Sequence, residues 1–184
     1  TDSFAYYAPE EELAGLPADV VQACREAAAA DGKPGCKLSL KMPVYLPVMQ
    51  FARSSALREV LYRAYATRAS DQAEGDARRF DNGALIREIL ALRQEEARLL
   101  GFQNFGEVSV TPKMAQSTTE VITFLRDLAK RARPYAEQDV ADLRAFAAER
   151  LGLSDPQPWD WPYISEQLKE ARYAFSEREL RQYF

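Results

Sequence analysis

The sequence contains no histidine among its 184 residues. This absence excludes, within the chain, zinc held by imidazole, serine–histidine and cysteine–histidine nucleophile pairs, and a histidine general base. The two cysteines, Cys24 and Cys36, are too few for a disulfide framework, and their spacing matches no metal pattern. We therefore expect two reduced cysteines in a cytosolic protein, and we assign no catalytic and no metal residue to this chain.

The sequence also lacks a long apolar run and an excess of positive charge. No stretch approaches the roughly 18 apolar residues that a membrane span needs, and no signal-peptide pattern is visible. With 24 basic and 28 acidic residues, the formal net charge is -4. This balance disfavours nucleic acid and anionic membranes as partners. The 47% of apolar and 28% of charged residues are typical of a globular protein with a hydrophobic core.

The most strongly patterned stretch runs from Ser117 to Gly152. Ser117 and Glu120 form a capping box at its start, and Gly152 is suited to the left-handed conformation that ends helices. Apolar residues recur between them at helical spacing. Pro134 interrupts the pattern at a cost of about 3 kcal/mol. We expect one long kinked helix or two helices that meet near Pro134.

Residues 36–42 alternate between apolar and polar side chains, which predicts a strand buried on one face. We find it no convincing partner. Val108–Val110 is the other candidate strand, but it follows Asn104, which reads better as the cap of a helix. Because unpaired strand groups are unfavourable when buried, we expect the partner to lie outside these residues. The start at Thr1 and the end at Phe184 fit a piece of a longer protein.

The remaining patterns are mostly helical. We expect helices over 18–30 and 56–69, a helix capped by Asp81 or Asn82 and ended by Gly101, and a helix from residues 159–163 to Arg172. We also expect a buried bend at 43–51 around Pro47, a surface loop at 70–80, and a final turn starting at Ser176. In the helix that Gly101 ends, the residues expected to form a firm apolar stripe are Leu85, Ile86, Ile89, Leu92, Leu99 and Leu100. Residues 1–15 are either an anchoring segment or a frayed terminus. The predicted fold class is mainly α, with one or two short strands.

Trp159, Asp160 and Tyr163 surround one acid with aromatic rings near the start of the last helix. Such a group can line a groove for peptides or sugars. We favour a packed corner in which Asp160 caps the helix.

Seven stretches resemble, in the same order, the thimet-type zinc oligopeptidases, most closely the bacterial members. They are ELAGLP (12–17), LPVM (46–49), ALREVLYRAYATRASDQ (56–72), ILALRQEEARLLGFQNF (89–105), FLRDLAKRARP (124–134), PWD (158–160) and ELRQYF (179–184). The resemblance covers nearly the whole chain. It implies a zinc endopeptidase of two largely helical lobes that cuts short peptides in a deep channel between them.

The resemblance assigns residues 1–184 to a single helical segment upstream of the family's zinc-binding His-Glu-x-x-His motif. Zinc then belongs to the parent protein, and we expect this segment alone to bind none and to hydrolyse no peptide. Trp159, Asp160 and Tyr163 would line the substrate channel. A second tyrosine commonly follows the first in the family, and Ile164 stands there instead, which weakens a substrate role for Tyr163.

We interpret the chain as a scaffold and channel-wall segment of a cytoplasmic oligopeptidase, with short peptides and the remainder of the same chain as its partners. The alternative is a self-contained helical module for protein interactions. A nucleic-acid adaptor is disfavoured by the charge balance. Peptide specificity and oligomeric state do not follow from these residues.

Overall fold

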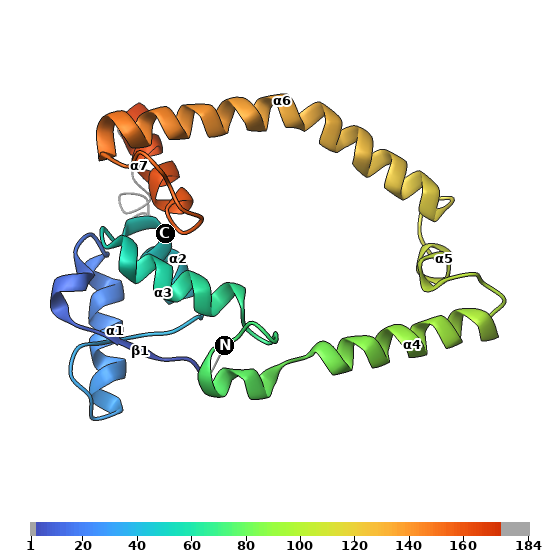
Figure 1. Cartoon of the computed structure of the whole chain (residues 1–184), viewed down its shortest axis with the longest axis horizontal. Coiled ribbons are helices and arrows are strands. Elements are labelled where there is room, and N and C mark those ends of the chain that lie inside the picture. The colour runs from blue at the N-terminus through green and yellow to red at the C-terminus, as the bar shows by residue number, and fades with distance from the viewer. Residues whose placement is uncertain (1–2, 174–184) are drawn as a thin grey trace. The chain divides into compact units, whose positions relative to one another are not determined.

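The computed structural model describes residues 3–173 of the chain. Their elements, in order, are β1 (Tyr6–Ala8), the 3-10 helix η1 (Glu10–Leu13), α1 (Ala18–Ala30), β2 (Cys36–Leu38), α2 (Met42–Phe51), α3 (Ser55–Ala66), the 3-10 helix η2 (Gly75–Phe80), α4 (Gly83–Leu99), α5 (Phe105–Val110), α6 (Thr118–Leu151) and α7 (Trp161–Tyr173) (Figure 1). The expectation of a mainly helical fold with short strands is confirmed. The turn predicted from Ser176 lies outside the described residues.

The chain divides into two compact units. Unit 1 comprises Thr1–Phe80 and Ala141–Phe184, and unit 2 comprises Asp81–Val140. The helix α6 contributes its first part to unit 2 and its last turns to unit 1.

The predicted strand at 36–42 is shorter than expected and has a partner. β1 and β2 form an antiparallel pair in which Tyr6 lies opposite Leu38 and Ala8 lies opposite Cys36. The prediction that this strand finds no partner within the chain is therefore wrong. The partner was missed because Tyr6-Tyr7-Ala8 is too short to show a period of two. The alternation itself holds, since Cys36, Leu38 and Leu40 are buried.

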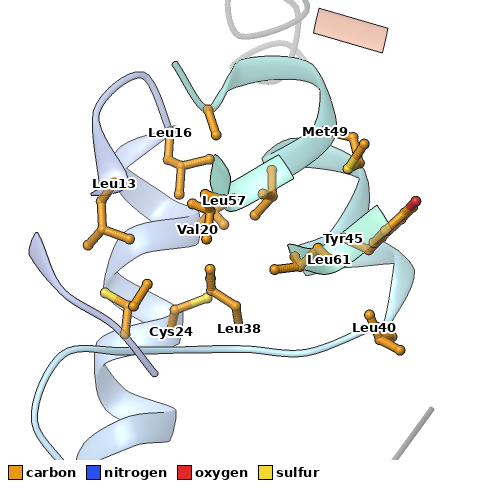
Figure 2. Packing of buried hydrophobic residues seen from close by; sticks show 14 residues of the cluster. Leu13, Leu16, Val20, Cys24, Leu38, Leu40, Tyr45, Met49, Leu57 and Leu61 are labelled. Atoms are coloured by element: carbon orange, nitrogen blue, oxygen red, sulfur yellow. The ribbon is translucent and has the colours of Figure 1, made fainter. Parts of the chain in front are cut away.

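The core of unit 1 lies where this two-stranded sheet meets α1, α2 and α3. Its buried apolar residues include Leu13, Leu16, Val20, Cys24, Leu38, Leu40, Tyr45, Met49, Leu57 and Leu61, whose side chains converge in Figure 2. Gly15 supports this packing with a φ of 96°, a conformation that other residues rarely adopt. A Cβ at this position would lie 2.2 Å from the carbonyl oxygen of Phe51. The turn before α1 and the end of α2 therefore approach each other closely only because residue 15 is glycine.

The segment around Pro47 is a helix and not the predicted bend. α2 contains Pro47 in its interior, where the missing N–H leaves the carbonyl of Pro43 without a helical partner. Pro47, Val48 and Met49 are all buried in unit 1. Burial of this apolar stretch outweighs the local cost of the proline.

The predicted long helix is one continuous helix through Pro134, which Figure 1 draws as α6. At its start, the backbone N–H of Glu120 donates to the Ser117 hydroxyl at 3.0 Å, and the Glu120 carboxylate accepts from the N–H of Gln116 at 2.6 Å. At its end, Gly152 has a φ of 68°. The residues predicted as caps therefore bound the helix.

Asn104 caps a helix, as preferred over a second strand. Its side-chain oxygen accepts from the N–H of Glu107 at 3.1 Å, so Val108–Val110 lies in α5. Among residues 3–173, no helix is both long and apolar enough to span a membrane.

Candidate functional site

The aromatic corner predicted from the sequence lies in unit 1, where the segment before α7 meets the start of α3. The N–H of Asp160 donates to the carbonyl of Gln157 at 2.9 Å, and the N–H of Gln157 donates to the Asp160 carboxylate at 2.9 Å. These two bonds close a turn. The N–H of Ile164 then donates to the carbonyl of Asp160 at 2.9 Å, which starts α7. Asp160 thus stands at the junction of turn and helix.

The centre of the corner is a buried ion pair. The Nη2 of Arg58, in α3, lies 2.5 Å from the Oδ1 of Asp160, and the two residues are 1% and 3% exposed. The hydroxyl of Ser55 donates to the same Oδ1 at 2.8 Å. Both partners of a buried pair must be present, because a single buried charge is strongly unfavourable. This pair therefore joins α3 to the start of α7 over a sequence separation of 102 residues.

Arg58 also contacts the end of α2. Its Nη1 donates to the carbonyl of Ala52 and, at 3.3 Å, to that of Arg53. The guanidinium lies over the ring of Tyr163, 4.4 Å from its centroid, in a cation–π contact. The Nε of Arg58 has no hydrogen-bond partner among the described residues. One arginine thus holds the end of α2, the aromatic ring of Tyr163 and the carboxylate of Asp160 together.

The electrostatics of the corner favour the charged form of Asp160. Burial alone raises the pKa of this carboxyl, but the hydrogen bonds from Arg58, from the N–H of Gln157 and from Ser55 outweigh it and hold the pKa below its ordinary value. The carboxylate is therefore a poor proton acceptor, and its oxygens already accept three groups. It is unsuited to general base catalysis.

Trp159 forms the partly exposed side of the corner. Its indole N–H donates to the Ser55 hydroxyl at 3.0 Å. Its ring lies 6.1 Å from that of Tyr62, centroid to centroid, and 5.2 Å from the guanidinium of Arg63. Trp159 and Tyr163 are both half-buried. The corner therefore offers aromatic surface that is held in place by the buried pair beneath it.

The other candidate groups are the acidic and cysteine side chains outside the corner. Within residues 3–173, no three acidic or cysteine side chains gather in a way that could hold a metal ion. Cys24 and Cys36 are free and buried, and burial followed by the proximity of Cys36 raises the pKa of Cys24 to about 11, so its thiol is a weak nucleophile. An open groove of about 490 Å³ lies between α1 and α2, and Asp19 is the ionisable residue among the described residues that line it. The described residues therefore do not fit a zinc site.

The structure unites the three residues predicted for the corner but shows that Asp160 is engaged mainly by Arg58 and not by helix amides. Arg58 was missed by the sequence analysis. The sequence pattern could have predicted its burial, because Arg58 lies next to Leu57 and three residues before Leu61 on the buried face of α3. A charged residue on a buried helix face calls for a buried counter-charge. Whether Trp159, Asp160 and Tyr163 line a substrate channel stays a prediction.

Comparison with known proteins shows the class of protein to which this helical chain belongs. The sequence model of peptidase family M3 matches residues 48–184. The chain therefore belongs to peptidase family M3, and the resemblance found in the sequence is confirmed.

Three relatives show the extent of this similarity. The chain is 49% identical to oligopeptidase A of Escherichia coli K12 over 175 residues, which are 95% of this chain and 26% of that protein. It is 40% identical to the organellar oligopeptidase A of Arabidopsis thaliana over 186 residues, covering 95% and 22%. It is 29% identical to the dipeptidyl carboxypeptidase of E. coli K12 over 174 residues, covering 94% and 25%. The chain spans about a quarter of the length of these relatives.

Proposed function

We propose that this chain is a non-catalytic scaffold and channel-wall segment of a cytoplasmic, zinc-dependent oligopeptidase that hydrolyses short peptides. The observation that carries the proposal is the match to family M3 together with a sequence free of histidine. The segment shares half of its residues with a bacterial oligopeptidase A but offers no imidazole for a metal. The zinc and the groups that activate water would then belong to other residues of the whole protein.

The geometry of the aromatic corner supports a place for it in the channel wall. Asp160 is buried and already accepts hydrogen bonds from three groups, so a peptide would meet the half-buried rings of Trp159 and Tyr163 and not the carboxylate. The Arg58–Asp160 pair would keep these rings in place as part of the channel wall. Aromatic rings of this kind can pack against apolar side chains of a peptide.

The test uses the purified 184-residue chain, a quenched-fluorescence peptide and metal analysis. We expect less than stoichiometric zinc and no hydrolysis above the uncatalysed rate. A parallel sample is the E. coli oligopeptidase A in which the matching 175 residues are replaced by this chain. We expect this chimera to bind zinc and to hydrolyse the peptide. Zinc-dependent turnover by the isolated chain would overturn the proposal, as would a folded, zinc-loaded chimera without activity.

A self-contained interaction module is the second candidate, and one observation favours it. β2 is paired with β1 inside the chain, and unit 1 has a core of its own. Because of this pairing, we expect the amides of residues 36–40 to be strongly protected from hydrogen exchange in a monomer, whether the chain is a peptidase segment or a self-contained module. The two candidates differ at unit 2, which a complete module would have to keep folded without further protein.

A further inference from the structure

One face of α4 is apolar and uncovered. Leu85, Ile89, Leu92 and Leu99 recur at intervals that place them on a single side of the helix. They are 54%, 47%, 58% and 81% exposed, respectively. We call these four residues the α4 stripe. The sequence predicts an apolar stripe on this helix, and the other residues of unit 2 leave it exposed.

The same shortage of packing extends through unit 2. Within residues 81–140, all of which the structure describes, Ala97 is the only buried residue. The N–H of Phe102, in the turn after α4, donates to the carbonyl of Ala97 at 2.8 Å, and α5 packs on α4. Helices in proteins gain most of their stability from packing an apolar face against other elements, and the residues of unit 2 supply little such packing to one another.

We propose that the α4 stripe is the docking surface for the remainder of a longer peptidase chain, packed against it within one polypeptide. This inference rests on the proposed function. It is supported by length, because the relatives are about four times as long as the part that this chain matches, and most of their residues are therefore available as the occupant.

A second copy of the chain fits the stripe less well. Glu96 lies on the same face, four residues after Leu92 and three residues before Leu99. An occupant that buries this face has to present a cation or a hydrogen-bond donor to the carboxylate. The cations Arg87 and Arg98 of α4 lie on its opposite face, and Arg93 covers the ring of Phe105 at 4.8 Å. A second α4 therefore does not offer the required charge along its own stripe.

The experiment compares hydrogen exchange in the isolated 184-residue chain and in the chimera described above. We expect the amides of residues 85–99 to exchange at least about tenfold more slowly in the chimera. Ile89→Glu and Leu92→Glu in the chimera should restore fast exchange. The matched control is Ala91→Glu, which adds the same charge at an exposed position on the opposite face and should leave the protection unchanged.

Three results would overturn the inference. Equal exchange of residues 85–99 in both proteins means that nothing covers the stripe. Protection that survives Ile89→Glu and Leu92→Glu means that another surface is responsible. A dimer of the isolated chain, seen by sedimentation and dissociated by Ile89→Glu, makes a second copy the occupant. Protection in a folded chimera that hydrolyses no peptide supports the docking surface and refutes only the proposed function.

Discussion

The Nη2 of Arg58 lies 2.5 Å from the Oδ1 of Asp160, and both side chains are almost completely removed from solvent. The attraction between two charges is strong at this depth, but so is the loss of hydration. The balance is favourable here because Ser55, the N–H of Gln157 and two carbonyl groups satisfy much of the remaining hydrogen-bonding capacity. The pair therefore holds the residue that precedes α7 against α3, while α7 itself packs on α2.

Removal of either partner should destabilise unit 1. We expect Arg58→Met and Asp160→Asn each to lower the free energy of unfolding by about 3–5 kcal/mol, because each leaves one buried charge uncompensated. The double variant should lose less than the sum of the two. Urea unfolding followed by circular dichroism measures these values.

The matched control is the exposed pair of Arg63 and Glu59, whose Nε and Oε1 lie 2.7 Å apart. Glu59→Gln removes this pair but keeps the guanidinium of Arg63 at the Trp159 ring. It should cost less than about 1 kcal/mol, because exposed pairs contribute little. Strictly additive losses at Arg58 and Asp160 would mean that the two side chains do not depend on each other.

The same pair predicts a dependence of stability on pH. The folded state holds the pKa of Asp160 below its ordinary value of 3.8. A group with a lowered folded pKa contributes stability at pH values above its unfolded pKa, and this contribution is lost as the pH falls through the folded pKa. Unfolding free energy should therefore decrease below about pH 4.

The control for this titration is Asp160→Asn, which removes the titrating group. The exposed carboxyls of Glu10 and Asp31 also have lowered pKa values and remain in the variant. The variant should therefore retain part of the acid dependence and show a smaller slope than the parent chain. Identical slopes in the two proteins would show that Asp160 does not titrate differently in the folded state.

The helix boundaries could be predicted because their determinants are local. Ser117, Glu120 and Gly152 lie at the two ends of α6. Asn104 lies directly before the short helix α5, which it caps. The α2 helix could not be predicted in the same way. Pro47 disfavours a helix locally, and the burial that outweighs it comes from other elements of unit 1.

The candidate site could be predicted only in part, for the same reason. Trp159, Asp160 and Tyr163 are close in sequence and form one visible cluster, whereas Arg58 lies about a hundred residues away. The amphipathic pattern of α4 correctly identified an apolar face, but a pattern within one helix contains no information about what covers it. The pairing of β2 with β1 was missed because three residues show too little periodicity.

Gly15 provides a sharp test of the packing in unit 1. Gly15→Ala would place a Cβ 2.2 Å from the carbonyl oxygen of Phe51 and would force a non-glycine residue to a φ of 96°. The backbone must then shift, which weakens the bond of 2.9 Å from the N–H of Arg53 to the carbonyl of Ala14. We expect a loss clearly larger than the roughly 1–2 kcal/mol that left-handed backbone alone costs an alanine.

Gly32→Ala is the control for this variant. Gly32 also has a left-handed φ, of 65°, but a Cβ there would meet no atom within 4 Å. It should show only the cost of about 1–2 kcal/mol for the backbone conformation. Thermal unfolding of both variants separates the two contributions. Equal losses would contradict the close approach between residues 14–15 and 51–53.

Pro134 provides the corresponding test in α6. Proline in a helix interior is about 3 kcal/mol less favourable than alanine, because it lacks the N–H that would bond the carbonyl of Lys130. The residue is exposed, so its replacement disturbs no buried contact in the described structure. Pro134→Ala should therefore increase the helical signal and slow amide exchange over residues 126–138. Ala136→Pro, two residues further along the same exposed stretch of α6, should have the opposite effect. A loss of helicity in Pro134→Ala would contradict this prediction. It would show that the helicity of α6 depends on a bend set by Pro134 more than on the hydrogen bond that proline cannot form.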